Sequence, residues 1–240
     1  MFNTQLKSNE TIELNNGTTI NFLLIKKYRR SIGLKICKDG LIVHAPILMA
    51  KSSIKKIIIS KQEWIKSKLD LINTHSPNFL VNDLSTFNLL GRTIKIRCLL
   101  GPKKVTLDGD LCLLSFNDLE NQEKLKKYFL KWLKSYAINY FKLRVDLYSK
   151  NHNLLTNNVL LSNAKTKWGT CNHKKEIRLN WRLIQSSPFI IDYVICHELS
   201  HLKYMNHSKQ FWGLVEEIFP QYKDAQKQLK LTGLLLYQLD

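Results

Sequence analysis

The sequence predicts an α+β fold, in which an antiparallel, β-rich N-terminal part is followed by a part dominated by helices. Apolar and polar residues alternate through much of residues 11–115, as they do in strands with one buried face. Near Asn117 the pattern changes to a helical period, which continues through residues 125–147. We therefore predict a β-rich domain with one helix at residues 1–116 and a second domain at residues 117–240.

Six segments of the first domain alternate in this way and are predicted strands: residues 19–25, 31–37, 41–45, 86–90, 92–99 and 111–115. Residues 38–40, Lys-Asp-Gly, have the composition of a hairpin turn. Residues 51–72 have a helical period and predict one helix with a large apolar inner side. That side consists of Ile54, Ile57, Ile58, Trp64, Ile65 and Leu69. No internal repeat is visible in the sequence.

The second domain is predicted to continue from the long helix through a pair of strands near residues 158–182 to a helix that begins at Pro188. Ser187 can cap this helix, and proline is favoured in the first helical turn. Its apolar residues are spread over more than one side: Ile190, Ile191, Val194, Ile195, Leu199 and Leu202. We therefore expect the helix to be packed rather than solvated.

This helix carries His197-Glu198-Leu199-Ser200-His201, the most specific pattern in the chain. A helix turns by about 100° per residue, so His197 and His201 project from one face with Glu198 beside them. Neutral imidazole is a good zinc ligand, and zinc with three protein ligands keeps a fourth position for water. The pattern predicts a catalytic Zn²⁺ site. A helix with solvated or buried histidines is the weaker interpretation.

A third zinc ligand is expected from outside this helix. If the helix continued to His207, that residue would lie about 600° beyond His201, on the far side of the helix. The helix should therefore end before it, and Asn206 tolerates the left-handed conformation that often ends helices. Ser208 can then cap a second helix over residues 209–219. We predict that the intervening turn brings His207 to the metal.

Two glutamates of that second helix, Glu216 and Glu217, are alternative third ligands. Charged residues on a helix are more often solvated than bound to metal, so His207 is preferred.

Length and composition are those of a globular protein. At 240 residues with 44% apolar residues, the chain can bury a core without disulfides. Its five cysteines form an odd set without a Cys-x-x-Cys pair, which suits a reducing compartment. The sequence has neither a secretory signal pattern nor an apolar run near the ~18 residues of a membrane span. We therefore predict a cytoplasmic protein with no membrane segment.

The net charge of +18 is compatible with nucleic acid as a partner. The lysines of residues 124–134 recur opposite the apolar side of the long helix, as in an ordinary solvated face. Residues 26–30, Lys-Lys-Tyr-Arg-Arg, are denser in charge and include an aromatic ring. Contact with a phosphate backbone is one interpretation of this segment, and an exposed hairpin end is the commoner one.

Parts of the second domain resemble a known family. The similar stretches are residues 167–171 (Lys-Trp-Gly-Thr-Cys), 177–183 (Ile-Arg-Leu-Asn-Trp-Arg-Leu) and 192–212, which contain the helix motif and Asn206-His207-Ser208. They resemble the YgjP-like family, a bacterial and archaeal group of predicted zinc metallopeptidases. The resemblance covers nearly the whole chain and implies a zincin-like catalytic domain, with the three histidines as zinc ligands and Glu198 as the catalytic glutamate. Thr170 stands where the family usually has serine, which preserves a hydroxyl group.

The sequence therefore predicts a zinc-dependent metallopeptidase that hydrolyses the amide bonds of a peptide or protein, with Glu198 as general base. A donor to the oxyanion stays open among Tyr193, Tyr204 and Arg182. Three alternatives also stay open: a nucleic-acid-associated protein with a structural zinc, a hydrolase of small amides, and, by analogy alone, a SprT-like protease of DNA-linked proteins.

The region before the motif helix has two interpretations. Residues 168–171 can form a wall of the structure or an edge for the substrate. A strand just before the helix can be ordinary sheet, or it can pair through a free edge with an extended peptide.

Overall fold

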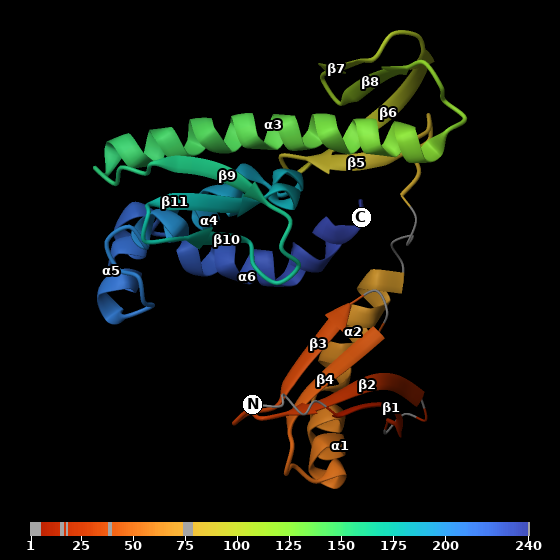
Figure 1. The fold of residues 1–240 in the computed structure, drawn as a ribbon, viewed down its shortest axis with the longest axis vertical. Helices are drawn as coiled ribbons and strands as arrows, with labels where there is room; N and C mark the ends of the chain where they lie inside the picture. The colour runs from red at the N-terminus through yellow and green to blue at the C-terminus, as the bar shows by residue number, and fades with distance from the viewer. Residues whose placement is uncertain (1–5, 15–16, 18, 38–39, 74–78, 240) are drawn as a thin grey trace. The chain divides into compact units, whose positions relative to one another are not determined.

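The computed structural model describes residues 6–14, 17, 19–37, 40–73 and 79–239 (Figure 1). The fold is α+β, as predicted, and the chain divides into two compact units between residues 77 and 78. This division differs from the boundary predicted after residue 116. The reason is that the buried side chains of residues 86–116 share one core with the long helix that follows them. None of the described helices is both long and apolar enough to cross a bilayer.

The first unit contains a four-stranded sheet. Its strands are β1 (Leu6–Glu13), β2 (Thr19–Lys27), β3 (Gly33–Cys37) and β4 (Gly40–Pro46). They are arranged in the order β1-β2-β4-β3. The β3–β4 pair is antiparallel, as predicted, and β1, which the sequence did not predict, is antiparallel to β2. The central strands β2 and β4 are parallel. The predicted antiparallel sheet is therefore a mixed sheet.

Two helices pack on this sheet, α1 (Lys51–Ser60) and α2 (Gln62–Asn73). The sequence predicts a single helix here, but Lys61 departs from helical geometry, with φ of −113° and ψ of 12°. Ile54, Ile58 and Ile65 are buried in the core of the unit, as predicted. Trp64 is 39% exposed and does not belong to that core.

The second unit begins with a sheet of the same topology. It consists of β5 (Thr86–Leu89), β6 (Arg92–Leu100), β7 (Lys104–Asp108) and β8 (Leu111–Phe116). The strand order is β5-β6-β8-β7, with β6 parallel to β8 and the outer pairs antiparallel. Each sheet is followed by a helix, so the arrangement occurs twice in the chain. The repeat is not visible in the sequence, because many different side chains satisfy the same alternation.

Helix α3 (Gln122–Asn151) spans the second unit (Figure 1). Its buried residues are spaced four apart: Leu125, Phe129, Leu133, Ala137, Phe141, Val145 and Ser149. Each such step turns about 40° past a full rotation, so the buried side winds around the helix. Near its start, Phe129 meets Phe87 of β5, with ring centroids 5.0 Å apart. Farther along, Arg144 forms a two-bond ion pair with Asp192 (2.8 and 2.5 Å).

A third sheet and the remaining helices complete the unit. The sheet has the order β10-β11-β9 and consists of β9 (Asn158–Ser162), β10 (Gly169–Cys171) and β11 (Glu176–Asn180). The helical elements are η1 (Trp181–Gln185), α4 (Pro188–Ser200), α5 (Lys209–Ile218), α6 (Tyr222–Thr232) and η2 (Gly233–Tyr237). Helix α4 lies in the centre of this core and carries Asp192, so the Arg144 pair connects it to α3.

Candidate active site

Helix α4 carries His197 and Glu198 of the motif, and His201 follows its last residue directly. Proline occupies its first turn and Ser187 its N-cap position, as predicted, although the Ser187 side chain makes no capping hydrogen bond. The helix ends at Ser200 and does not continue toward Asn206. After Ser200 the backbone tightens to bonds three residues apart, in which the N–H of Leu202 donates to the carbonyl of Leu199 and the N–H of Lys203 donates to that of Ser200.

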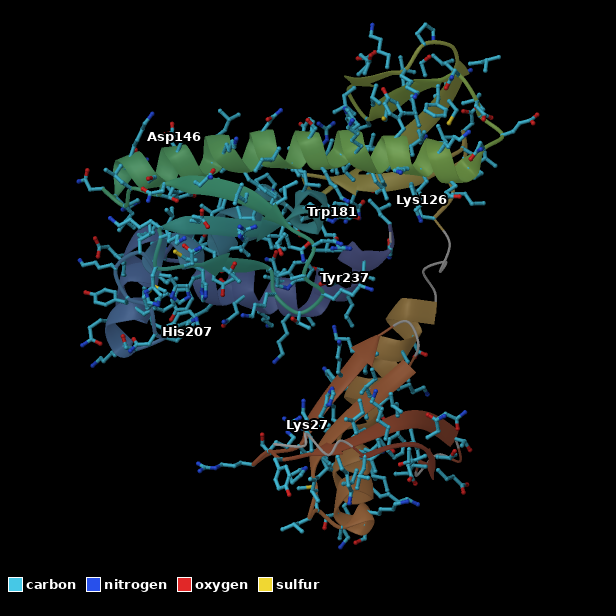
Figure 2. All side chains as sticks on the ribbon, in the orientation of Figure 1. Lys27, Lys126, Asp146, Trp181, His207 and Tyr237 are labelled. Carbon is cyan, nitrogen blue, oxygen red and sulfur yellow. The ribbon has the colours of Figure 1, made fainter. Side chains whose placement is uncertain are left out.

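The three histidines of the predicted site lie together. His201 follows the end of α4 but keeps helical φ and ψ of −67° and −18°. One ring nitrogen from each of His197, His201 and His207 lies within 4.8 Å of the other two. Nε2 of His207 is 3.1 Å from Nε2 of His197. His207, labelled in Figure 2, precedes α5, whose N-cap Ser208 accepts a hydrogen bond from the N–H of Phe211.

The chemistry of these histidines fits a divalent metal. The carbonyl of Tyr204 can only accept, so the 3.0 Å contact makes Nδ1 of His201 the donor and leaves the lone pair of Nε2 available to a metal. Burial, followed by repulsion from the other two imidazoles, lowers the pKa of His197 to about 3. Burial also lowers the pKa of His201. Two nitrogens at about 2.05 Å from a tetrahedral metal lie about 3.3 Å apart, close to the observed separation.

Glu198 lies beside the histidines in a pocket of about 430 Å³. The pocket is lined by Lys167, Trp168, Gly169, Thr170, Cys171, Tyr193, Val194, His197, Glu198, His201, Met205, His207 and Leu229. Glu198 is only 4% exposed, and this burial raises the pKa of its carboxyl to about 8, although Lys167 opposes the shift. A carboxyl group of this kind can change its protonation state near neutral pH.

The edge strand β10 forms one side of the pocket. The strand that directly precedes the helical part, β11, is central in its sheet, so the free edge belongs to β10 rather than to that strand. Gly169 and Cys171 pair with Leu179 and Ile177, which are fully buried, and therefore face the interior with them. The pKa of Cys171 is raised to about 11, first by burial and then by Glu198. Its thiol is therefore protonated at neutral pH.

The three candidate donors to the oxyanion lie in different surroundings. Tyr193 lines the pocket. Tyr204 contributes its carbonyl to His201. Arg182 is buried between the rings of Trp181 and Tyr237, both labelled in Figure 2, at 4.7 and 4.9 Å. This position in the core does not suit a donor to substrate.

The two glutamates of α5 lie on its exposed side. Glu217 is exposed, and Glu216 lies 3.8 Å from Lys223 Nζ. The basic segment at residues 26–30 belongs to the first unit, where Tyr28 is 83% exposed.

Two parts of the pocket were outside the sequence prediction. Leu229 reaches it from α6, 28 residues after His201, and one apolar residue in an amphipathic helix carries no signal of such a role. Gly169 is the second part. Its lack of a side chain matters because Glu198 lies against it, and the sequence does not record that contact.

The buried Glu198 predicts a pH dependence for the stability of the metal-free protein. Its folded pKa of about 8 lies above the ordinary 4.5, so its contribution is complete below pH 4.5 and is lost as the pH rises toward 8. The lowered pKa of His197 has the opposite effect between pH 6.5 and 3. We therefore expect chemical denaturation to show a loss of about 2 kcal/mol between pH 6.5 and 8.

A Glu198→Gln variant is the control for this stability profile. Glutamine has the same size but does not titrate, so the metal-free variant should keep a flat stability over the same pH range. An equal decline in both proteins would assign the pH dependence to other groups.

Two helix histidines one turn apart, a third beyond the helix end, and a buried glutamate in a pocket are together characteristic of metal-dependent peptidases. This class agrees with a comparison against protein families, in which the YgjP-like metallopeptidase domain matches residues 30–232. The chain belongs to the YgjP-like family, and it is a metal-dependent peptidase.

Solved structures similar to the chain include two metallopeptidase zymogens. Abylysin of Pyrococcus abyssi is 23% identical with a TM-score of 0.37, and the match covers 40% of this chain and 95% of that one. Jannalysin of Methanocaldococcus jannaschii is 26% identical with a TM-score of 0.33, covering 40% and 96%. No curated protein matches the chain.

Proposed function

We propose that the chain is a zinc-dependent peptidase in which His197, His201 and His207 hold the metal and Glu198 is the general base. The observation that carries this proposal is the convergence of three imidazole nitrogens within 4.8 Å beside a buried carboxylate. A site with three neutral nitrogen ligands and space for a further ligand suits zinc.

Each group has a distinct part in the proposed reaction. The bound metal would supply a Lewis acid that activates water and polarises the scissile carbonyl. Glu198 accepts the proton of the attacking water and then donates it to the leaving nitrogen. Burial that raises the pKa of Glu198 to about 8 suits both steps, because the carboxylate gains basicity and the carboxylic acid persists near neutral pH.

The pocket supports an extended peptide as substrate. β10 pairs with β11 on one side only, so its other edge can pair with a peptide strand beside Glu198. Such pairing would place a backbone amide near the histidines. Tyr193, Val194 and Leu229 add apolar surface to the pocket, which suits an apolar side chain of the substrate. Small amides would not use the strand edge.

Removal and return of the metal tests the proposal. The purified protein should contain about one zinc ion per chain, cleave a library of unstructured peptides, and lose both properties together after treatment with a chelator. Addition of one equivalent of Zn²⁺ should restore cleavage. The control is circular dichroism, which must show that the metal-free chain remains folded. Cleavage that persists without metal, or a folded chain that does not bind zinc, would contradict the proposed function.

A further inference from the structure

Gly169 lies against the side chain of Glu198. A Cβ atom added at residue 169 would meet Oε1 of Glu198 and lie 2.6 Å from its Cγ and 2.7 Å from its Cδ. Carbon atoms in favourable contact are about 3.5 to 4.0 Å apart. The carboxylate therefore occupies the space that any other residue at position 169 would fill with its side chain.

The backbone gives no reason for glycine at this position. The described glycines with positive φ are Gly17, Gly40, Gly91 and Gly109, and Gly169 is not among them. It forms a regular antiparallel pair with Leu179, and this backbone pairing by itself would accept alanine. Glycine within a strand often marks a site of close approach by another group, and that group here is Glu198.

The consequence of a side chain at position 169 would be local. The overlap extends from Cγ to Oε1 of one buried side chain, so a Cβ at position 169 would displace the outer part of Glu198, including its carboxylate. The metal-binding nitrogens belong to other residues, and none of them is among the three nearest atoms to the added Cβ. A displacement of about 1 Å is enough to lower a rate about a hundredfold when it moves a catalytic group.

We propose that Gly169 is a positioning residue. Because it has no side chain, the Glu198 carboxylate can lie between strand β10 and the histidines. This inference rests on the proposed role of Glu198 as general base. Gly169 itself performs no chemistry. It determines where the base lies relative to a peptide paired with β10, and so acts through kcat rather than through retention of the metal.

The variant Gly169→Ala tests the proposal, with Gly213→Ala as the matched control. Gly213 lies in α5 with nothing within 4 Å of an added Cβ. We expect Gly169→Ala to keep the zinc content and KM of the original chain and to lower kcat by about a hundredfold. Gly213→Ala should change none of these values. A Gly169→Ala chain that keeps its full kcat would overturn the proposal, even if Glu198→Gln is inactive.

A double-mutant cycle separates positioning from an ordinary structural role. In the metal-free protein, Gly169→Ala should lower the thermal midpoint when Glu198 is present and leave it unchanged in a Glu198→Ala background, where the space is free. A chain that folds only as the double variant would also support the proposal. An equal loss of stability in both backgrounds would show that Gly169 serves the strand alone. Retained turnover in Glu198→Gln would instead overturn the proposed function.

Discussion

Replacing Glu198 with glutamine is expected to lower kcat by about 10² to 10⁴ while the zinc content stays unchanged. Glutamine has nearly the same volume, so it can occupy the space beside Gly169. It has no basic oxygen that could take a proton from water. The measurement is steady-state cleavage of a quenched fluorescent peptide, with metal content determined on the same samples.

The Glu198→Gln experiment depends on an intact site. The variant should bind substrate, since only the proton acceptor is lost, and an unchanged KM would separate the loss of proton transfer from a collapsed pocket. Turnover close to that of the original chain would remove Glu198 from its proposed role. Loss of metal together with activity would show that the carboxylate also supports the ligands.

Replacing His207 with alanine is expected to weaken zinc binding by more than about a hundredfold at equal folded yield. Loss of a second-shell partner already weakens metal sites by about 10- to 100-fold, and His207 would be a direct ligand. Its Nε2 lies 3.1 Å from Nε2 of His197, so its removal would leave two imidazoles in the cluster. Competition with a chromogenic chelator measures the affinity.

The two glutamates of α5 provide a control for the His207 experiment. A Glu216→Gln, Glu217→Gln double variant should keep its zinc affinity, because both side chains are exposed. If this variant lost zinc and His207→Ala kept it, the third ligand would be a glutamate of α5.

The sequence predicts the α+β class correctly because hydrophobic period is a local property. In the second unit the predicted strands at 86–90, 92–99 and 111–115 correspond to β5, β6 and β8. Strand β7 was not predicted, and the predicted pair near residues 158–182 consists of three strands. The unit boundary depends on which distant residues share a core. Phe87 packs against Phe129, and no local pattern records that contact. For the same reason, the parallel pairing of β2 with β4 could not be read from alternation alone.

The candidate site was predicted where its residues are close in sequence. His197, Glu198 and His201 depend only on helical geometry, and α4 provides it. His207 required a prediction of the helix end, which lies at Ser200, where hydrogen bonds between residues three apart replace the α-helical ones. Leu229 comes from another helix, and its place in the pocket is a result of tertiary folding.

The same strand order occurs on both sides of residue 77, and each sheet pairs strands of its own unit. The second sheet shares its core with α3 and the motif helix, whereas the core of the first sheet is completed by α1 and α2. Substitutions in the described strands of the first unit should therefore leave the backbone pairing of the catalytic unit unchanged.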